Sequence, residues 1–487
     1  MLELTTFATP AFWVLLAFFF YVTTQRLRGK RVDLLAVWRI FRSTPLLIAI
    51  GIMAFGGLTL RFYMNYLVPA DILQDIVGAT GYRESGSFYP QNYVQSAEQW
   101  LGSHPPVRPF AAFPNLDRLQ SALIANNSFE VPSIVHPPQM TMIAFLLLRV
   151  LPGRWLGPFI SLVSLIGLAL CTIKLLMTYY PSATWRDHVL AVMLVVSWQP
   201  VIATVRLGQF GIAIGVLITS FWLLARRGKL ISACVCLALA ASLKLYPLIF
   251  FLFLLIVWRR AFVTATAVYA CGFASSLWFF GLKGLLNYFQ SANSTVAFYG
   301  SGAVNISLLA RMNDITVGWP HKQQFVARAA FAALLLVAVC WFWLTQRREL
   351  GLTSALPEKV GAWDRNVAIV CCLCCLWSPI SWTHYFPILL LPCVLLIVKT
   401  SPGAGNIKQR GSIVVFLVLL LLSLSDRTVW GLLSVLSGKV GATMGTVLSA
   451  YPTYALIVLI FLLNRGSPDG SRLTKPQQHG PIPVGAA

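Results

Sequence analysis

Long apolar runs separated by short polar or basic clusters make up most of the chain. The runs lie near 10–25, 44–66, 139–151, 156–178, 188–205, 210–226, 230–243, 245–258, 261–282, 326–346, 365–379, 383–399, 411–425 and 445–464. A membrane-crossing helix needs about 20 apolar residues, so the shorter runs are expected to form half-helices or re-entrant segments. Strands of a barrel would instead alternate polar and apolar positions over ~10 residues. The pattern therefore predicts an all-α, polytopic membrane helix bundle with roughly 11–13 crossings.

Composition supports this class. Hydrophobic residues make up 57% of the chain and charged residues 11%, with a mean hydropathy of +0.74, whereas soluble domains carry about 25% charged residues. The net charge of +22 is distributed in short clusters between apolar runs, which is typical of cytoplasmic anchors and not of a continuous nucleic-acid surface. We therefore expect a multi-pass protein of the cell membrane that contacts membrane lipids and no nucleic acid.

The charge distribution also predicts an orientation. The first apolar run, Phe12 to Val22, is followed by basic residues from Arg26 onward, the reverse of a signal peptide, so residues 1–43 are expected to form a retained anchor with a basic cytoplasmic segment. The span near 44–66 then leads outward. On this reading the loop 67–138 is non-cytoplasmic, while the orientation of 139–205 remains open.

The rest of the chain divides by polarity. Residues 44–464 are expected to form one membrane domain with two outer loops, 67–138 and 283–325, and residues 465–487 a disordered tail. The first loop is long and rich in proline, asparagine and aromatic residues. Loops of this length are commonly functional, so we expect short helices on the membrane surface that cover a pocket.

Acidic residues are scarce, with 15 Asp and Glu in 487 residues. Asp71 and Asp75 stand at the start of the first outer loop and, four residues apart, would share a helix face. Partial desolvation at the membrane boundary raises a carboxyl pKa toward values useful for proton transfer. Both are therefore candidate general bases, and the alternative is that they are solvated loop acids.

Three ionisable residues are predicted near membrane depth, where charge is costly. They are Lys244, His384 and Arg206. For Lys244 the alternative is snorkelling to the membrane interface, for His384 an interfacial aromatic belt, and for Arg206 a simple anchor. For Gln209 the alternative is a role in helix packing. Taken together, cations opposite an acid-bearing loop suit an anionic lipid phosphate.

The ten cysteines do not suggest a disulfide or zinc framework. All lie in apolar runs, including the CxxC spacing of Cys372 and Cys375, so packing within the membrane is the preferred interpretation. No acid cluster indicates a metal, and no glycine-rich loop indicates a nucleotide. We therefore predict no cofactor and no nucleotide-sugar donor.

The order of motifs resembles glycosyltransferase family 87, the polyprenyl-phosphate-mannose-dependent mannosyltransferases of the GT-C fold. The matching segments are Gln74-Asp75-Ile-Val-Gly-Ala, Gly86-Ser-Phe-Tyr89-Pro90, His136-Pro-Pro138, Gly208-Gln209, Ala240-Ala-Ser-Leu-Lys244-Leu-Tyr-Pro247, Asn305-Ile-Ser-Leu-Leu309 and Ser378-Pro-Ile-Ser-Trp-Thr-His384. The resemblance covers about residues 45–400. No single segment is specific, but their order is.

The resemblance implies inverting transfer of a hexose, mannose by the family name, from a polyprenyl-phosphate donor to a lipid or glycan acceptor. It also implies that an aspartate of the first outer loop is the base. The Gln-Asp-Ile-Val context favours Asp75, whereas the spacing to the loop's Gly and Tyr fits Asp71. Asp75 is therefore the preferred base, and Asp71 is the alternative.

The remaining site residues follow from the same resemblance. Lys244, His384 and Arg206 are expected to hold the phosphate. The residues expected to line the substrate pocket are Tyr89, His136, Gln209, Asn305 and Trp382. The alternative function is a lipid or glycan transporter, against which the absence of an internal repeat and the long acidic loop both argue.

Overall fold

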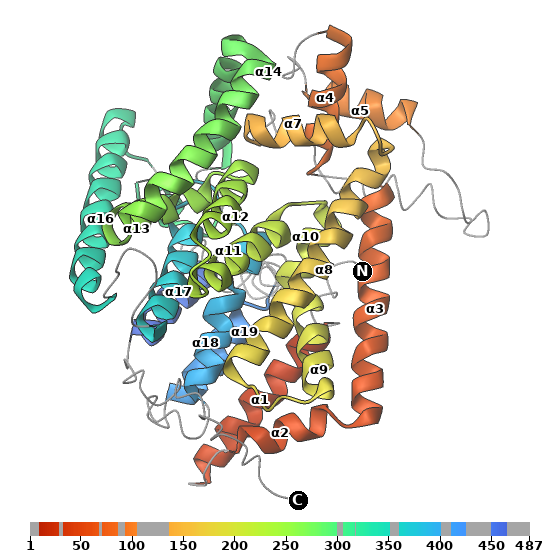
Figure 1. Ribbon diagram of the computed structural model, residues 1–487, viewed down its shortest axis with the longest axis vertical. Helices are drawn as coiled ribbons and strands as arrows, with labels where there is room; N and C mark the ends of the chain where they lie inside the picture. Colours follow the sequence, from red (N-terminus) through yellow and green to blue (C-terminus); the bar gives the residue numbers. More distant parts are fainter. Residues whose placement is uncertain are drawn as a thin grey trace, which may run out of the picture.

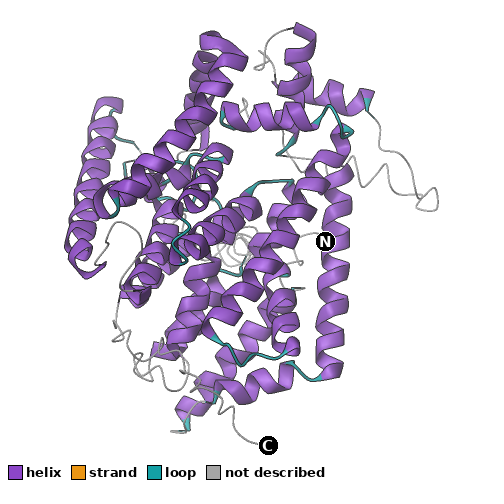
Figure 2. Cartoon of the chain, viewed as in Figure 1, coloured by secondary structure: helices purple, strands orange, loops and turns teal. Residues whose placement is uncertain are grey.

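The computed structural model describes residues 9–28, 33–67, 71–85, 93–104, 136–299, 305–316, 318–350, 360–400, 411–424 and 450–464. Every regular element in these ranges is a helix (Figure 2), so the predicted all-α polytopic class is confirmed. Five helices are long and apolar enough to cross a membrane: Thr44–Leu67, Gly153–Tyr179, Arg259–Asn293, His321–Arg347 and Val360–Trp377. The bent pair Trp185–Val196 and Gln199–Leu207 would make a sixth.

The N-terminal helices form a turn at one end of the bundle. Helix α1 (Pro10–Leu27) leads to the short α2 (Leu34–Phe41) and then to α3 (Thr44–Leu67), which extends along one side of the molecule (Figure 1). Trp38 and Arg42 bind Asp187 near the start of α9 (Trp185–Val196). We call this end of the bundle, where α2 meets the start of α9, the basic end. Arg226 also lies here, with its guanidinium over the ring of Tyr179 at the end of α8.

The opposite end, which we call the loop end, contains α4 (Leu73–Ser85), α5 (Tyr93–Ser103) and α7 (Pro138–Leu147). Helix α7 lies across this end (Figure 1) and has only 10 residues, too few to cross a membrane alone. Prolines at 137 and 138 begin this helix.

Most of the remaining helices run between these two ends. Their bounds are α8 (Gly153–Tyr179), α10 (Gln199–Leu207), α11 (Gly211–Arg226), α12 (Leu230–Leu243), α13 (Ile249–Val257), α14 (Arg259–Tyr299), α16 (His321–Leu350), α17 (Val360–Trp377), α18 (Leu390–Thr400), α19 (Gly411–Leu421) and α22 (Tyr451–Asn464). Three short elements lie at the loop end: η2 (Tyr246–Leu248), α15 (Leu308–Ile315) and η3 (Thr383–Leu389). Residues 283–299, which belong to the predicted second outer loop, form the part of α14 that follows a break at Gly281.

The first loop is fixed to the bundle by a buried arginine. Arg154, in the first turn of α8, donates to the backbone carbonyls of Leu67, Leu101 and His104. These carbonyls lie at the end of α3 and the end of α5, where helices have unsatisfied acceptors. Arg154 therefore positions α4 and α5 over the bundle.

Candidate active site

Asp75 lies in the first turn of α4 and is completely buried. Its Oδ2 is 2.6 Å from Nδ1 of His136, and its Oδ1 accepts from the hydroxyl of Thr141 at 3.3 Å. His136 and Thr141 come from the start of α7, so α4 and α7 are joined through this carboxylate. Both Asp75 oxygens are engaged, and no surface is left for an incoming hydroxyl group.

His136 is itself enclosed. Its ring packs edge-on against Phe210, and its Nε2 is 3.4 Å from Nε2 of Gln74. The Asp75 carboxylate therefore orients this imidazole from one side while Gln74 faces the other. Such carboxylate–imidazole pairs fix the orientation and tautomer of the ring.

Asp71 precedes α4 by two residues and is partly exposed. Its backbone amide donates to the carbonyl of Leu207 at 2.9 Å, which attaches the loop to the end of α10. Within the described part of the chain its carboxylate has no hydrogen-bond or ion-pair partner. Desolvation raises the pKa of Asp71, while the positive charges of Lys244 and His136 act in the opposite direction.

The end of α10 is held in place by Asn65 of α3. Asn65 donates to the Val205 carbonyl at 2.8 Å. Gly208 then adopts φ +69, and a Cβ there would lie 2.8 Å from Oδ1 of Asn65. A side chain is thus excluded on both conformational and steric grounds, and the turn delivers Gln209 into the site.

Lys244 ends α12 in extended conformation and is buried. Its Nζ donates to Oε1 of Gln209 at 3.0 Å and to the Tyr385 hydroxyl at 3.4 Å, and it lies 4.4 Å from the centre of the Tyr385 ring. Tyr246 stacks on the other side of the cluster against Tyr385, with ring centres 4.8 Å apart. No described carboxylate lies within ion-pair distance of Lys244, so this ammonium is solvated by neutral groups only.

His384 lies in η3 and is 5% exposed. Its Nε2 is buried and has no hydrogen-bond partner among the described residues. The same holds for Nε2 of Gln209. Two buried polar groups beside an unpaired ammonium are unusual, because a buried polar atom without a partner costs free energy.

Close helix packing sets the position of His384. A Cβ on Gly211 would lie 2.3 Å from the His384 carbonyl oxygen, and this carbonyl accepts from the Thr204 hydroxyl at 3.0 Å. The absence of a side chain at Gly211 therefore lets η3 lie directly on α11, level with Gln209.

Asn305 and Trp382 support the His384 segment. The Asn305 amide donates to the Pro379 carbonyl, and its oxygen accepts from the amides of Ser307 and Ser381. Trp382 packs 5.2 Å from His384, measured between ring centres. The side chain of Asn305 thus joins its own segment to the segment before His384 by hydrogen bonds to backbone groups. Trp382 packs beside the imidazole of His384.

Two predicted residues are not brought into this cluster. Arg206 lies in the last turn of α10 and is partly exposed, and the hydrogen bonds formed by Lys244 and Gln209 do not involve it. Tyr89 lies outside the described residues.

Conversely, the sequence interpretation did not assign Thr141 or Tyr385 to the site. The polar character of Thr141 in an apolar helix, and the position of Tyr385 next to His384, were the available signals.

The fold and this cluster together define a polytopic helical membrane protein with a buried, cation-bearing site opposite a partly exposed acid. The model of glycosyltransferase family 87 matches residues 135–356. The resemblance to this family is thereby confirmed, and it indicates a glycosyltransferase. The matched region contains His136, Gln209, Lys244 and Asn305 but neither acid of the first loop. No curated protein and no solved structure matches the chain.

Proposed function

We propose that the protein transfers a hexose, mannose in the first instance, from a polyprenyl-phosphate donor to a lipid or glycan acceptor. The observation that carries this proposal is the buried group of Lys244, Gln209 and His384. Nε2 of Gln209 and Nε2 of His384 have no hydrogen-bond partner among the described residues, and the Lys244 ammonium beside them contacts neutral groups only, close to a partly exposed carboxylate. A lipid phosphate would supply the missing acceptor, and charge-assisted hydrogen bonds to it gain strength in a dry site.

We assign the base to Asp71. Its carboxylate is partly exposed and unpartnered, whereas Asp75 is buried with both oxygens engaged. Asp71 removes the proton of the acceptor hydroxyl as that oxygen attacks the anomeric carbon. The bond from this carbon to the phosphate oxygen breaks with inversion, and polyprenyl phosphate leaves with the electron pair.

Lys244 and His384 act on the leaving group. Negative charge increases on the phosphate as the bond breaks, and the Lys244 ammonium stabilises this charge. His384, through Nε2, donates a hydrogen bond to the same group. Asp75 is a positioning residue, because it holds His136 and α7 against α4.

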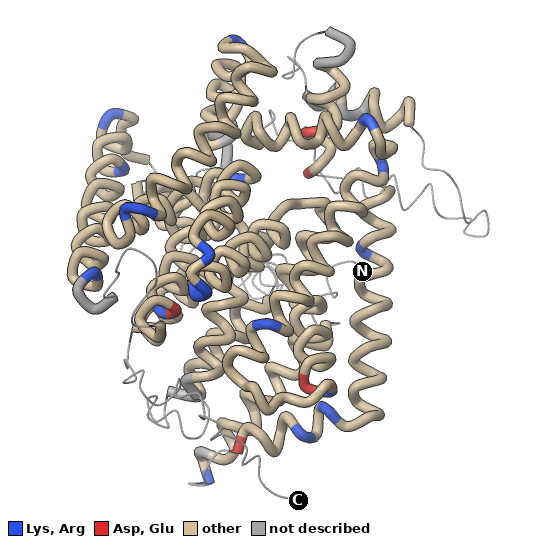
Figure 3. The backbone as a smooth tube through the Cα atoms, in the orientation of Figure 1, with Lys and Arg blue, Asp and Glu red and all other residues tan. Residues whose placement is uncertain are grey.

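We place the loop end on the non-cytoplasmic side. Basic residues predominate around α2, the start of α9 and the end of α11 (Figure 3), and such clusters favour the cytoplasm. A single cysteine placed at Ser96 of α5 would react with an impermeant reagent on intact cells. Reaction only after lysis would reverse the orientation.

The direct test of function is an assay of purified protein in detergent. The donor is polyprenyl-phosphate mannose, a range of acceptors is offered, and the release of polyprenyl phosphate is measured together with the glycosylated product. Release coupled to product formation supports a transferase. Movement of intact donor across a vesicle membrane without cleavage would instead favour the transporter alternative.

A further inference from the structure

A partly open cavity lies between the N-terminal helices and the bundle, near the basic end. Its volume is about 500 Å³, within the ~300–1,000 Å³ of ligand pockets in proteins. The walls come from α1, α2, α8, α9, α18 and α19, and almost all are apolar side chains such as Phe18, Leu176 and Phe416. None of the candidate catalytic residues lines this cavity.

The basic end of the cavity is closed by α2. Trp38 donates to Asp187 at 2.8 Å, and Arg42 forms an ion pair with the same carboxylate at 3.3 Å. These contacts hold α2 across the cavity. Arg39, one turn away, also borders the cavity but is exposed. Within the described ranges the structure gives its guanidinium no hydrogen-bond or ion-pair partner.

Apolar walls and an unpaired cation at the rim define one class of ligand. An apolar cavity excludes water, so its natural occupant in a bilayer is hydrocarbon. The two arginines against one aspartate leave positive charge at the rim, which attracts anionic headgroups. The short amphipathic α2, with Leu35 and Ile40 exposed, is typical of a helix in the headgroup region.

We propose that this cavity binds one acyl chain of an anionic phospholipid from the leaflet at the basic end, with the phosphate at Arg39. In this position the lipid contacts α1, α2 and α18. Helix α18 follows directly on the η3 segment, which carries His384. It thus occupies a space that the side chains of the described residues leave open. This inference does not depend on the proposed sugar transfer.

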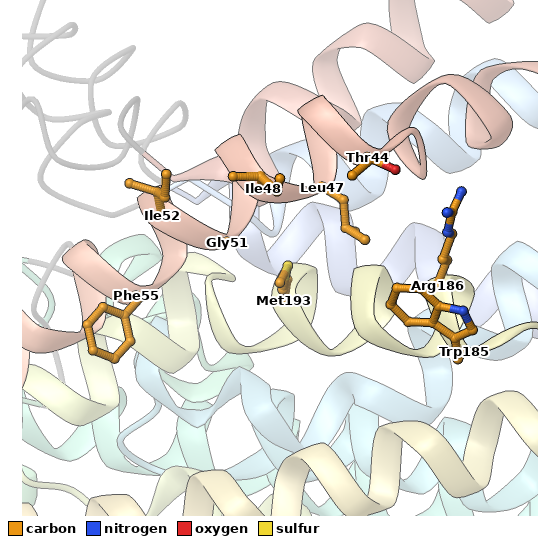
Figure 4. A pocket seen from close by; sticks show the side chains of 9 residues that line it. All are labelled: Thr44, Leu47, Ile48, Gly51, Ile52, Phe55, Trp185, Arg186 and Met193. Carbon is orange, nitrogen blue, oxygen red and sulfur yellow. The ribbon is translucent and has the colours of Figure 1, made fainter.

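A nearby groove provides an internal comparison. Between α3 and α9, residues including Gly51, Ile52 and Met193 border an open surface groove with Trp185 and Arg186 at one end (Figure 4). It is bordered by fewer residues than the cavity and is more open to the surroundings. We expect bulk lipids to exchange freely there, so it reports the background level of lipid contact.

The test uses a phosphatidylglycerol that carries a diazirine near the end of one acyl chain. The protein is placed in phosphatidylcholine nanodiscs, irradiated, and the labelled peptides are identified by mass spectrometry. We expect labelling of α1, α8 and α19 at cavity positions, several-fold above labelling of α3 and of the lipid-facing side of α16. A phosphatidylcholine probe should label the cavity much more weakly.

Two variants sharpen the result. Arg39→Gln should reduce cavity labelling about fivefold, which is the effect of removing one cation near a membrane surface. The matched control Arg227→Gln removes an exposed cation from the end of α11, outside the cavity, and should leave labelling unchanged. Ala191→Phe, which fills the cavity from α9, should abolish it while groove labelling persists.

Three outcomes would overturn the proposal. These are equal labelling by the two phospholipid probes, equal effects of Arg39→Gln and Arg227→Gln, or displacement of the label by polyprenyl phosphate but not by unlabelled phosphatidylglycerol. The last would assign the cavity to the tail of the proposed donor. Because no readout requires turnover, failure here is separable from failure of the proposed function.

Discussion

The two ends of the bundle both bury a charged side chain, but only one of these charges has an opposite charge beside it. At the basic end, Asp364 accepts hydrogen bonds from Tyr179 and Trp222, each at 2.7 Å, and pairs with Arg226 at 3.3 Å. At the loop end, Lys244 has no acid partner, and Nε2 of His384 has no partner at all in the described structure. Asp364 thus has its countercharge within the protein, whereas Lys244 has none among the described residues.

This difference separates structural charge from functional charge. A buried ion pair with its hydrogen bonds in place fixes helices relative to one another, and its disruption is costly. A buried cation solvated only by an amide, a phenol and an aromatic face still has capacity for an anion. Burial and charge alone do not distinguish these cases, so the presence or absence of a countercharge is the informative observation.

Asp71→Asn should have the largest effect on turnover. Removal of the base should lower the rate by about 100-fold or more, while binding of polyprenyl phosphate is retained. The control is Asp314→Asn, which changes an acid that pairs locally with Arg311 on α15. Near-normal turnover in Asp71→Asn together with loss of turnover in Asp75→Asn would instead assign the general base to Asp75.

Lys244→Ala and His384→Ala should each reduce kcat/KM by roughly 10-fold, because each removes a charge-assisted or orienting contact to one leaving group. The double variant should lose less than the product of the single effects, since both residues contact the same phosphate. A double-mutant cycle in steady-state kinetics measures this coupling. Strict additivity would indicate that the two side chains act at separate places.

The pH dependence should reflect the environment of Asp71. Desolvation raises its pKa, so the ionised base is lost as pH falls through a value above that of an ordinary aspartate. The positive charge of Lys244 opposes this shift, so Lys244→Gln should move the acidic limb of kcat/KM to higher pH. If the acidic limb stayed at the same pH or moved to lower pH, the group that titrates in that limb would not be Asp71.

Asp364→Ala should have the smallest effect on turnover and a clear effect on stability. It leaves the partly buried Arg226 without its acid, and breaking a fully buried pair costs roughly 3–5 kcal/mol, which is the upper bound here. Thermal unfolding in detergent should shift to lower temperature, while the folded enzyme retains its kcat. Loss of kcat at a temperature where the variant is folded would contradict the distinction between the two ends.

The sequence predicted the parts of this account that depend on local pattern. Long apolar runs indicate helices, and the rarity of acids pointed to Asp71 and Asp75 before their positions were known. The sequence could not show that Asp75 is engaged by His136 and Thr141, because these contacts join residues more than sixty positions apart. Nor could it distinguish α7 from a crossing helix, since both are apolar, and packing across the loop end decides between them.

Binding of polyprenyl phosphate without a sugar tests the central claim most directly, since it asks whether the unsatisfied group at the loop end accepts a lipid phosphate. Affinity would be measured by native mass spectrometry of the purified protein, the Lys244→Ala and His384→Ala variants, and Arg365→Ala as a basic-end control. We predict that each loop-end variant binds roughly 10-fold more weakly and that Arg365→Ala binds like the unmodified chain. Equal affinity in all four proteins would contradict the assignment of Lys244 and His384 to the donor phosphate.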